Sequence, residues 1–283
     1  MFWKVKGREI SLDRTLLMGA LNLTPDSFSD AGKYLDPQKA ITRALRLIEE
    51  GADILDLGAE STRPGAEPVP AAEEIDRLLP VLEALHGRTD ALLSIDTTKS
   101  EVAKICLEKG AHIINDVSGL RDSGSAMAEL AREFEAGIIL MHRRGDPKTM
   151  NLFTDYEKGL EEIKAELESN VRLALAAGIS REQIVIDPGL GFSKTAETSI
   201  AILSHLELFH DLGFPVLIGP SRKSFIGQVT GRGVHEREFG TAACVAIAVL
   251  KGAGIVRVHD AGAMRDAVKM AEAIRSIHHV GTF

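Results

Sequence analysis

The chain has 283 residues, of which 45% are hydrophobic and 26% are charged, which is typical of a folded globular protein with a large core. Its net charge of -8 argues against nucleic acid or an anionic membrane as the partner, because such surfaces are bound by clustered Lys and Arg. The most apolar stretch, residues 242–250, is shorter than the roughly 20 residues that cross a bilayer, and residues 1–10 lack the apolar centre of a secretory signal.

The two cysteines lie in apolar helical patterns far apart in the sequence. Cys106 and Cys244 are therefore expected to be buried thiols rather than a disulfide or a metal-binding pair. Reduced thiols make the cytoplasm the expected location.

Eight short apolar runs recur along the chain, and each is followed by polar turn residues and then by a helical pattern. They are residues 15–21, 53–59, 91–96, 112–117, 137–142, 184–189, 215–219 and 254–259. Strands that alternate with helices pair in parallel, and eight such units in about 250 residues are typical of a (β/α)8 barrel. The sequence predicts one TIM-barrel domain over residues 1–283, with parallel strands inside and helices outside. An open doubly wound sheet is disfavoured, because no Gly-x-Gly-x-x-Gly turn follows the first run.

The helices carry recognisable start and stop signals. Asp36 is the expected N-cap of the first helix, with Pro37 at its first position and Gly51 at its end. Pro80 is expected to kink or split the helix that contains it. Residues 231–251 predict an additional helical segment between the seventh and eighth strands.

A long polar segment follows the first strand. Residues 22–34 read NLTPDSFSDAGKY and exceed the about 2 to 6 residues of an ordinary βα connection. We expect this segment to cover the active site, with Asn22 at its root and Phe28 near its tip.

Polar residues follow nearly every predicted strand. The active site of such a barrel lies at the C-terminal ends of its strands, so these residues are the candidates for function. They are Asn22, Glu60, Ser61, Thr62, Arg63, Asp96, Asn115, Asp116, His142, Asp187, Ser221, Arg222, Lys223, Arg257, His259 and Asp260.

Two carboxylates and an amide form the first informative group. Asp96, Asn115 and Asp187 suit a flat heterocycle with several N–H donors, because a carboxylate accepts two parallel N–H bonds. For Asp116, capping of a turn is the favoured interpretation.

Basic residues form the second informative group. Arg257 and His259 lie two residues apart, hence on one side of a strand, and Arg63 comes from another loop. Such a set suits a phosphate or pyrophosphate, and a surface ion-pair network is the alternative. Asn22 could ligate a hard cation such as magnesium, which usually keeps few protein ligands when bound with a phosphate substrate. Lys223, in GPSRKSF, could donate to a ring carbonyl or act as a Schiff-base nucleophile, and spacing does not choose between these roles.

Seven segments together resemble the dihydropteroate synthase family nearly end to end: MGALNLTPDSFSDAG, DLGAESTRPGAEPV, SIDTTKSEVA, INDVSGL, IDPGLGFSK, IGPSRKSFIG and VRVHD. The resemblance implies a magnesium-dependent (β/α)8 barrel of folate biosynthesis. It implies a transferase that joins 6-hydroxymethyl-7,8-dihydropterin pyrophosphate to p-aminobenzoate and releases pyrophosphate. It also implies a homodimer formed through outer helices.

The resemblance also implies roles for individual residues. The pterin would contact Asp96, Asn115, Asp187 and Lys223, with Met141, Phe192 and Gly219 lining the pocket. The pyrophosphate would contact Thr62, Arg63, Arg257 and His259, and Asn22 would bind magnesium. The p-aminobenzoate would contact Phe28, Pro64, Phe192 and Ser224. Catalysis would depend on Arg63, Asp96, Lys223, Arg257 and His259, with Lys223 as a hydrogen-bonding cation rather than a Schiff base.

The chain departs from the family pattern in two places. Ala31 precedes Gly32 where the family commonly has two glycines, and residues 141–151 are more basic than usual, which leaves Arg143 and Arg144 without an assigned role. Two alternatives stay open: a pterin-binding methyl-transfer domain, which needs no pyrophosphate clamp, and a non-catalytic pterin-binding protein. The joint presence of STRPG, SRKSF and RVH favours the synthase.

Overall fold

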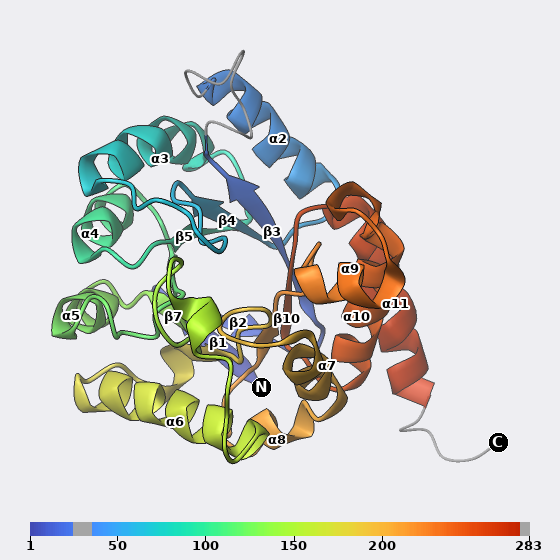
Figure 1. The fold of residues 1–283 in the computed structure, drawn as a ribbon. Helices are drawn as coiled ribbons and strands as arrows, with labels where there is room; N and C mark the ends of the chain where they lie inside the picture. The colour runs from blue at the N-terminus through green and yellow to red at the C-terminus, as the bar shows by residue number, and fades with distance from the viewer. Residues whose placement is uncertain (25–35, 278–283) are drawn as a thin grey trace.

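The structure is a computed structural model that describes residues 1–24 and 36–277, and it confirms the predicted TIM barrel. Eight parallel strands lie at the centre of a ring of helices (Figure 1). Their order is β8-β7-β6-β5-β4-β3-β10-β9, and a parallel bridge between Ile186 and Val216 joins the two ends of the sheet. The strands are β3 (Leu16–Asn22), β4 (Ile54–Gly58), β5 (Leu92–Asp96), β6 (Ile113–Asp116), β7 (Gly137–Met141), β8 (Ile184–Asp187), β9 (Leu217–Ile218) and β10 (Ile255–Val258).

Helices follow the strands and cover the outside of the barrel. The α-helices are α2 (Pro37–Glu49), α3 (Ala71–Leu85), α4 (Ser100–Glu108), α5 (Ser125–Glu133), α6 (Leu160–Ala176), α7 (Ala196–Ser204), α8 (Glu207–His210), α9 (Ser224–Thr230), α10 (Glu238–Leu250) and α11 (Ala261–Ile277). The 3-10 turns are η1 (Met150–Leu152), η2 (Arg181–Gln183) and η3 (Val234–Glu236). Across residues 1–24 and 36–277, no helix combines the length and the apolar character that crossing a membrane requires.

The helix signals have mixed outcomes. Asp36 caps α2 as predicted, since its side chain accepts hydrogen bonds from the backbone N–H groups of the first turn. Pro80 does not split its helix, because α3 runs from Ala71 to Leu85 with Pro80 inside it. The fully buried side chains of Leu78 and Val81 hold this part of α3 on the core, which offsets the loss of one backbone donor. The extra segment before the last strand is present as α10.

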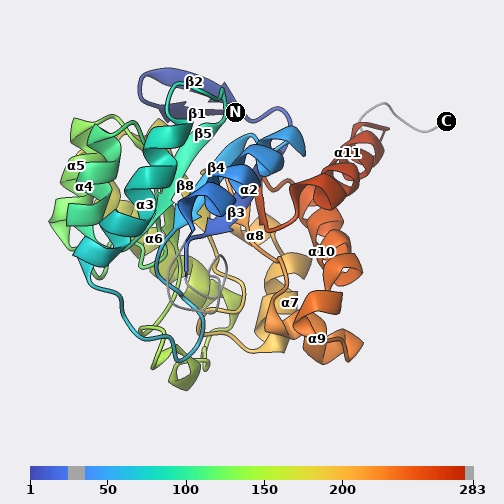
Figure 2. The same cartoon turned by 90° about the horizontal axis from the view of Figure 1, so that it is seen from above.

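An N-terminal hairpin was not anticipated. Strand β1 (Phe2–Val5) pairs antiparallel with β2 (Arg8–Ser11) across a turn at Lys6 and Gly7, both with positive φ. Figure 2 shows this hairpin at one end of the barrel, with α9 at the opposite end. Trp3 is fully buried beneath β7, where a side chain on Gly137 would come within 2.8 Å of its ring. The hairpin therefore plugs one end of the barrel and leaves the other for the active site.

The interior of the barrel changes from apolar to polar along the strands. Alternate residues of a strand point to the same side, so residues two apart share the inward face. The apolar layer packs against Trp3 and Val5 and consists of Leu16, Met18, Ile54, Leu92, Ile113, Ile139, Val185, Leu217 and Ile255. Two residues further along five of these strands, the same inward position is occupied by Asp56, Ser94, Asn115, Asp187 and Arg257. This polar layer lies toward the C-terminal ends of the strands.

Candidate active site

Asp56 is the centre of the polar layer. It is fully buried in β4, and its Oδ1 accepts a hydrogen bond from Ser94 Oγ at 2.7 Å. Its Oδ2 accepts from Asn115 Nδ2 at 3.0 Å and from Arg257 Nε at 2.6 Å. Asp56 was not among the sequence-predicted candidates, because those were the residues at the strand ends. The available signal was a lone carboxylate inside an apolar strand, two residues after Ile54.

Arg257 links two carboxylates. Besides its bond to Asp56, its Nη2 donates to Oδ2 of Asp96 at 2.9 Å. Burial raises the pKa of Asp96 to about 7, while the positive charge of Arg257 acts in the opposite direction. The structure therefore brings the predicted Asp96 and Arg257 together in an inward ion-pair network rather than on the surface. Within the described ranges, Nη1 of Arg257 forms no hydrogen bond and is available to a ligand.

Asp187 is held by the turn that follows it. Its Oδ1 accepts a hydrogen bond from the backbone N–H of Gly189 at 2.7 Å. Gly189 has a φ of +72°, and a Cβ there would lie 2.1 Å from the carbonyl oxygen of His142, so glycine is required. Burial raises the pKa of Asp187 to about 6, opposed by the Gly189 hydrogen bond and by Lys223.

Lys223 and Phe192 lie against each other near Asp187, at the C-terminal end of the barrel. The Nζ of Lys223 is 3.9 Å from the centroid of the Phe192 ring. Burial, with a contribution from Arg257, lowers the pKa of Lys223 to about 8, so the amine is mostly protonated at neutral pH. Met141 is buried at the end of β7, and Gly219 follows β9 beside Arg257.

His259 connects the ends of three strands. Its Nδ1 is 2.9 Å from Ser221 Oγ, and its Nε2 is 3.4 Å from Nδ2 of Asn22. Burial and the charge of Arg257 lower its pKa to about 3. His259 was predicted to belong to the basic group, whereas its lowered pKa leaves the ring neutral and able to act as a hydrogen-bonding group.

The loop after β4 carries predicted residues that do not touch this network. Thr62 is half-buried and Arg63 and Pro64 are exposed, and no ion pair of the Arg63 guanidinium occurs in the part of the chain that the structure describes. Glu60 fastens the base of the loop, since its carboxylate accepts from the backbone N–H of Val69 at 2.7 Å. The predicted Ser224 is also exposed, at the start of α9, and the predicted Phe28 lies outside the described residues.

The two unassigned arginines have acidic partners. Arg143 pairs with Asp122, while Arg144 pairs with Glu162 and Glu166. Their charges are thus compensated, and they add no anion site. Asp116 caps a turn as predicted, because its carboxylate accepts from the backbone N–H groups of Ser118 and Leu120 at 2.8 and 2.9 Å.

Asn22 is the only sequence-predicted metal ligand. No group of three or more His, Cys, Asp or Glu side chains within 1–24 and 36–277 is arranged to hold a metal ion. The Asn22 amide lies at the end of β3 with its nitrogen beside His259, and its carbonyl oxygen accepts no hydrogen bond from any described residue. One neutral oxygen donor fits a magnesium ion whose other ligands are phosphate oxygens and water.

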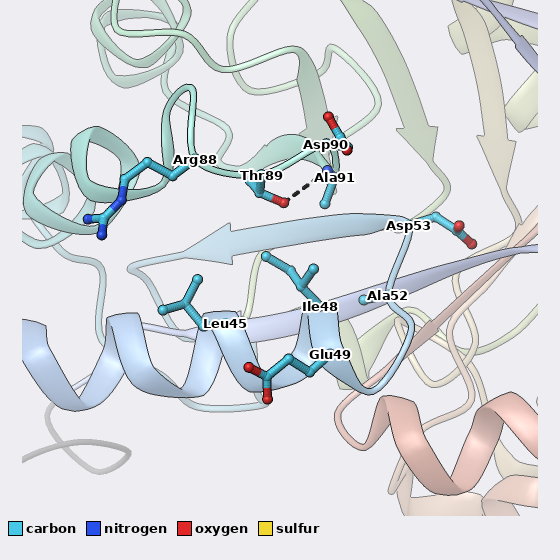
Figure 3. Close-up of a pocket in the computed structure, with 9 residues that line it drawn as sticks. All are labelled: Leu45, Ile48, Glu49, Ala52, Asp53, Arg88, Thr89, Asp90 and Ala91. Carbon is cyan, nitrogen blue, oxygen red and sulfur yellow. Dashed lines mark hydrogen bonds between the residues drawn. The ribbon is translucent and has the colours of Figure 1, made fainter.

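A depression of about 490 Å³ lies elsewhere, between α2 and the loop before β5 (Figure 3). Its lining residues Asp53 and Ala91 precede β4 and β5, so it is at the opposite ends of the strands from the polar layer. Arg14 already pairs with Asp53 at 2.6 Å. In Figure 3 the side chains of Glu49, Arg88 and Asp90 point away from one another, so the depression lacks the convergent polar groups of the polar layer.

Known proteins share both the sequence and the fold. A family model for pterin binding enzymes matches residues 18–259. The dihydropteroate synthase of Synechocystis sp. is 46% identical over 262 residues, covering 92% of this chain and 90% of that protein. The crystal structure of Yersinia pestis dihydropteroate synthase with a sulfonamide drug superposes with a TM-score of 0.91 and 39% identity. The match covers 98% of this chain and 100% of that chain. The Xanthomonas albilineans dihydropteroate synthase with 4-aminobenzoic acid covers 98% of this chain and 99% of its own, with a TM-score of 0.90 and 40% identity.

Proposed function

The chain belongs to the pterin-binding enzyme family and, within it, to the dihydropteroate synthases, and we propose that its polar layer carries the chemistry of that reaction. In this reaction 6-hydroxymethyl-7,8-dihydropterin pyrophosphate is joined to p-aminobenzoate. The observation that carries the assignment is the inward-facing set of Asp56, Asp96 and Arg257 directly above an apolar barrel layer.

The pterin ring binds through its N–H edge in this proposal. Asp187 offers an ionised oxygen, and Asn115 is oriented by its bond to Asp56. Asp96 lies beside them and is already paired with Arg257. The close packing of these groups in a buried layer supports recognition of a flat ring rather than of a flexible chain.

The pyrophosphate is the leaving group. The bond between the pterin methylene carbon and the pyrophosphate oxygen breaks, and its electron pair leaves with the oxygen. The charge that develops is stabilised by Arg257 through its unused Nη1, by hydrogen bonding to His259, and by Arg63 and Thr62 from the loop after β4. The carbon left behind is cationic, and the carboxylate of Asp96 stabilises it electrostatically.

Magnesium is the proposed cofactor, with Asn22 as its protein ligand. A bound magnesium ion would supply positive charge to the pyrophosphate oxygens. The unused carbonyl oxygen of Asn22 beside His259 supports this position. The other charged groups proposed at the leaving group are Arg257 and Arg63, and a divalent ion would add to their positive charge against the pyrophosphate.

The acceptor p-aminobenzoate binds on the outer side of the pterin. Its neutral amine attacks the cationic carbon and then loses a proton, and no covalent enzyme intermediate forms. The aromatic ring of Phe192, with Pro64, Ser224 and Phe28, forms the proposed contact surface. The match to a solved relative that holds 4-aminobenzoic acid supports this acceptor.

We propose that residues 1–283 act as one domain within a cytoplasmic homodimer. The two free thiols, Cys106 and Cys244, suit a reducing compartment. Exposed apolar side chains gather on α10 and α11, which pack side by side (Figure 2): Phe239, Ile247, Leu250, Met270, Ile274 and Ile277. Sedimentation equilibrium tests the dimer, which Phe239→Asp should weaken and Phe153→Asp, on an exposed residue elsewhere, should not.

Release of pyrophosphate tests the proposed reaction. The purified protein should release pyrophosphate from the pterin pyrophosphate when p-aminobenzoate is added and much more slowly without it. A methyl-transfer domain or a non-catalytic pterin-binding protein would bind the pterin but show no such dependence.

A further inference from the structure

Lys194 is a buried lysine that the proposed mechanism does not use, and burial lowers its pKa to about 7. It lies in the loop between β8 and α7, and its side chain is 8% exposed. Its Nζ is 2.9 Å from His142 Nδ1, 3.2 Å from the carbonyl oxygen of His142 and 2.9 Å from the carbonyl oxygen of Phe192. In its protonated form the amine has three N–H donors, one for each of these three acceptors. These bonds tie the residue after β7 to the loop after β8.

His142 extends this connection to the outer helix α6. Its ring is fully buried, and Nε2 lies 2.9 Å from Oε2 of Glu166. Burial and the nearby Lys194 lower the pKa of His142 to about 4, so the ring is neutral. Since Lys194 donates to Nδ1, the proton of the ring is on Nε2 and is donated to Glu166. Arg144 in turn holds Glu166.

The other end of the connection is the backbone of Phe192. Its carbonyl oxygen accepts both from Lys194 Nζ and from Ser193 Oγ, the latter at 2.7 Å. The Phe192 side chain faces Lys223 at 3.9 Å, at the site assigned above to p-aminobenzoate. The glycines at 189 and 191 both have positive φ, so the backbone of this turn depends on such cross-links to stay in one place.

We propose that Lys194 is a positioning residue for the acceptor substrate, which acts by fixing the backbone of Phe192 against the end of β7. The inference rests on the proposed function, since it takes Phe192 as a contact of p-aminobenzoate. Lys194 touches neither substrate and transfers no proton in this account. Its burial is costly for a cation, whereas an apolar side chain of similar length would fill the same volume without that cost. The three hydrogen bonds explain the presence of a cation here.

The test is Lys194→Met, which keeps the length of the side chain and removes its donors. The KM for p-aminobenzoate should rise about tenfold, with a lower kcat, because small displacements of a binding group weaken productive binding. The KM for the pterin pyrophosphate should change less than twofold. Lys164→Met is the matched control, since Lys164 forms a surface ion pair with Asp211 at 3.0 Å on α6. Lys194→Gln, which keeps two N–H donors on a shorter side chain, should fall between the parent and Lys194→Met and is the second variant if Lys194→Met does not fold.

A double-mutant cycle separates positioning from general structural damage. If Lys194 acts through Phe192, then Lys194→Met added to Phe192→Ala should raise the KM for p-aminobenzoate no further. Additive effects, or equal rises in the KM of both substrates, would overturn the inference. Failure of the proposed function is distinguishable, because the parent protein itself would then show no release of pyrophosphate dependent on p-aminobenzoate.

Discussion

The Nε of Arg257 donates a hydrogen bond to the buried Oδ2 of Asp56 over 2.6 Å, although the two residues lie on strands that are not neighbours. The bond passes from β10 to β4 across the intervening β3. Arg257 is thereby oriented before any substrate arrives, which is the condition for strong electrostatic stabilisation of a leaving group. Asp56 is thus a positioning residue for Arg257.

Asp56→Asn should impair both stability and catalysis. It removes a buried charge that faces the Arg257 guanidinium, and breaking such a buried pair costs about 3 to 5 kcal/mol in free energy of unfolding. Urea unfolding measures this loss, and steady-state kinetics should show a lower kcat. Asp211→Asn, which breaks an exposed pair with Lys164, should change the free energy of unfolding by about 1 kcal/mol or less. Equal effects of the two substitutions would contradict the role of Asp56.

Asp187→Asn should weaken pterin binding. The amide presents a donor where the ring edge also presents one, and an unpaired buried polar group costs about 1 to 3 kcal/mol. Calorimetry with a pterin that lacks the pyrophosphate measures the affinity. Unchanged affinity in this variant would remove Asp187 from the pterin site.

The pH dependence of Asp187 gives a separate prediction. Burial raises its folded-state pKa to about 6, above the ordinary value of 3.8, so the folded protein binds this proton more tightly than the unfolded chain does. The ionised carboxylate therefore destabilises the folded protein. This destabilisation is absent below about pH 4 and fully present above about pH 6. Asp187→Asn should resist urea better than the parent at pH 8, and this advantage should vanish near pH 4. Pterin affinity of the parent should fall as the pH drops below about 6. A variant less stable than the parent at pH 8 would contradict this assignment of the charge.

Arg257→Ala and His259→Ala should slow release of pyrophosphate more than they weaken binding of a pterin that lacks the pyrophosphate. The reason is that the proposed partner of both side chains is the leaving group. Single-turnover release and calorimetry with the bare pterin separate the two effects. If both variants lose affinity for the bare pterin while turnover at saturation survives, the leaving group is bound elsewhere.

Removal of magnesium should stop release of pyrophosphate, and Asn22→Ala should raise the magnesium concentration needed for half-maximal rate. Affinity for the bare pterin should stay unchanged, because that ligand has no phosphate to bring the metal. Titration of the chelated enzyme with magnesium makes the measurement. Identical magnesium dependence in the parent and Asn22→Ala would contradict the assignment of Asn22.

Much of the fold was predictable because buried parallel strands are read directly from apolar runs. The N-terminal hairpin was not predicted, since its two strands have only four residues each and the burial of Trp3 beneath β7 depends on the folded barrel. The runs also predicted β9 (Leu217–Ile218) as longer than the two residues that pair.

The candidate site was predictable where a polar residue ends a strand, as at Asp96 and Asp187. Asp56 was missed although a lone carboxylate inside an apolar strand was a usable signal. Lys194 was not predictable, because its partner His142 lies 52 residues away in the chain. Ion pairs across the barrel decide which charges are compensated. These pairs cannot be inferred from the spacing of residues along the sequence. For the same reason Arg143 and Arg144 had no assigned role until their acidic partners were known.

The most direct test of the central claim is a product balance for the parent protein with magnesium, the pterin pyrophosphate and p-aminobenzoate. The account predicts that 7,8-dihydropteroate and pyrophosphate accumulate in equal amounts, identified by mass and by a phosphate assay, and that Arg257→Ala slows both equally. Release of pyrophosphate without dihydropteroate, or formation of neither product by a folded protein that binds the pterin, would contradict it.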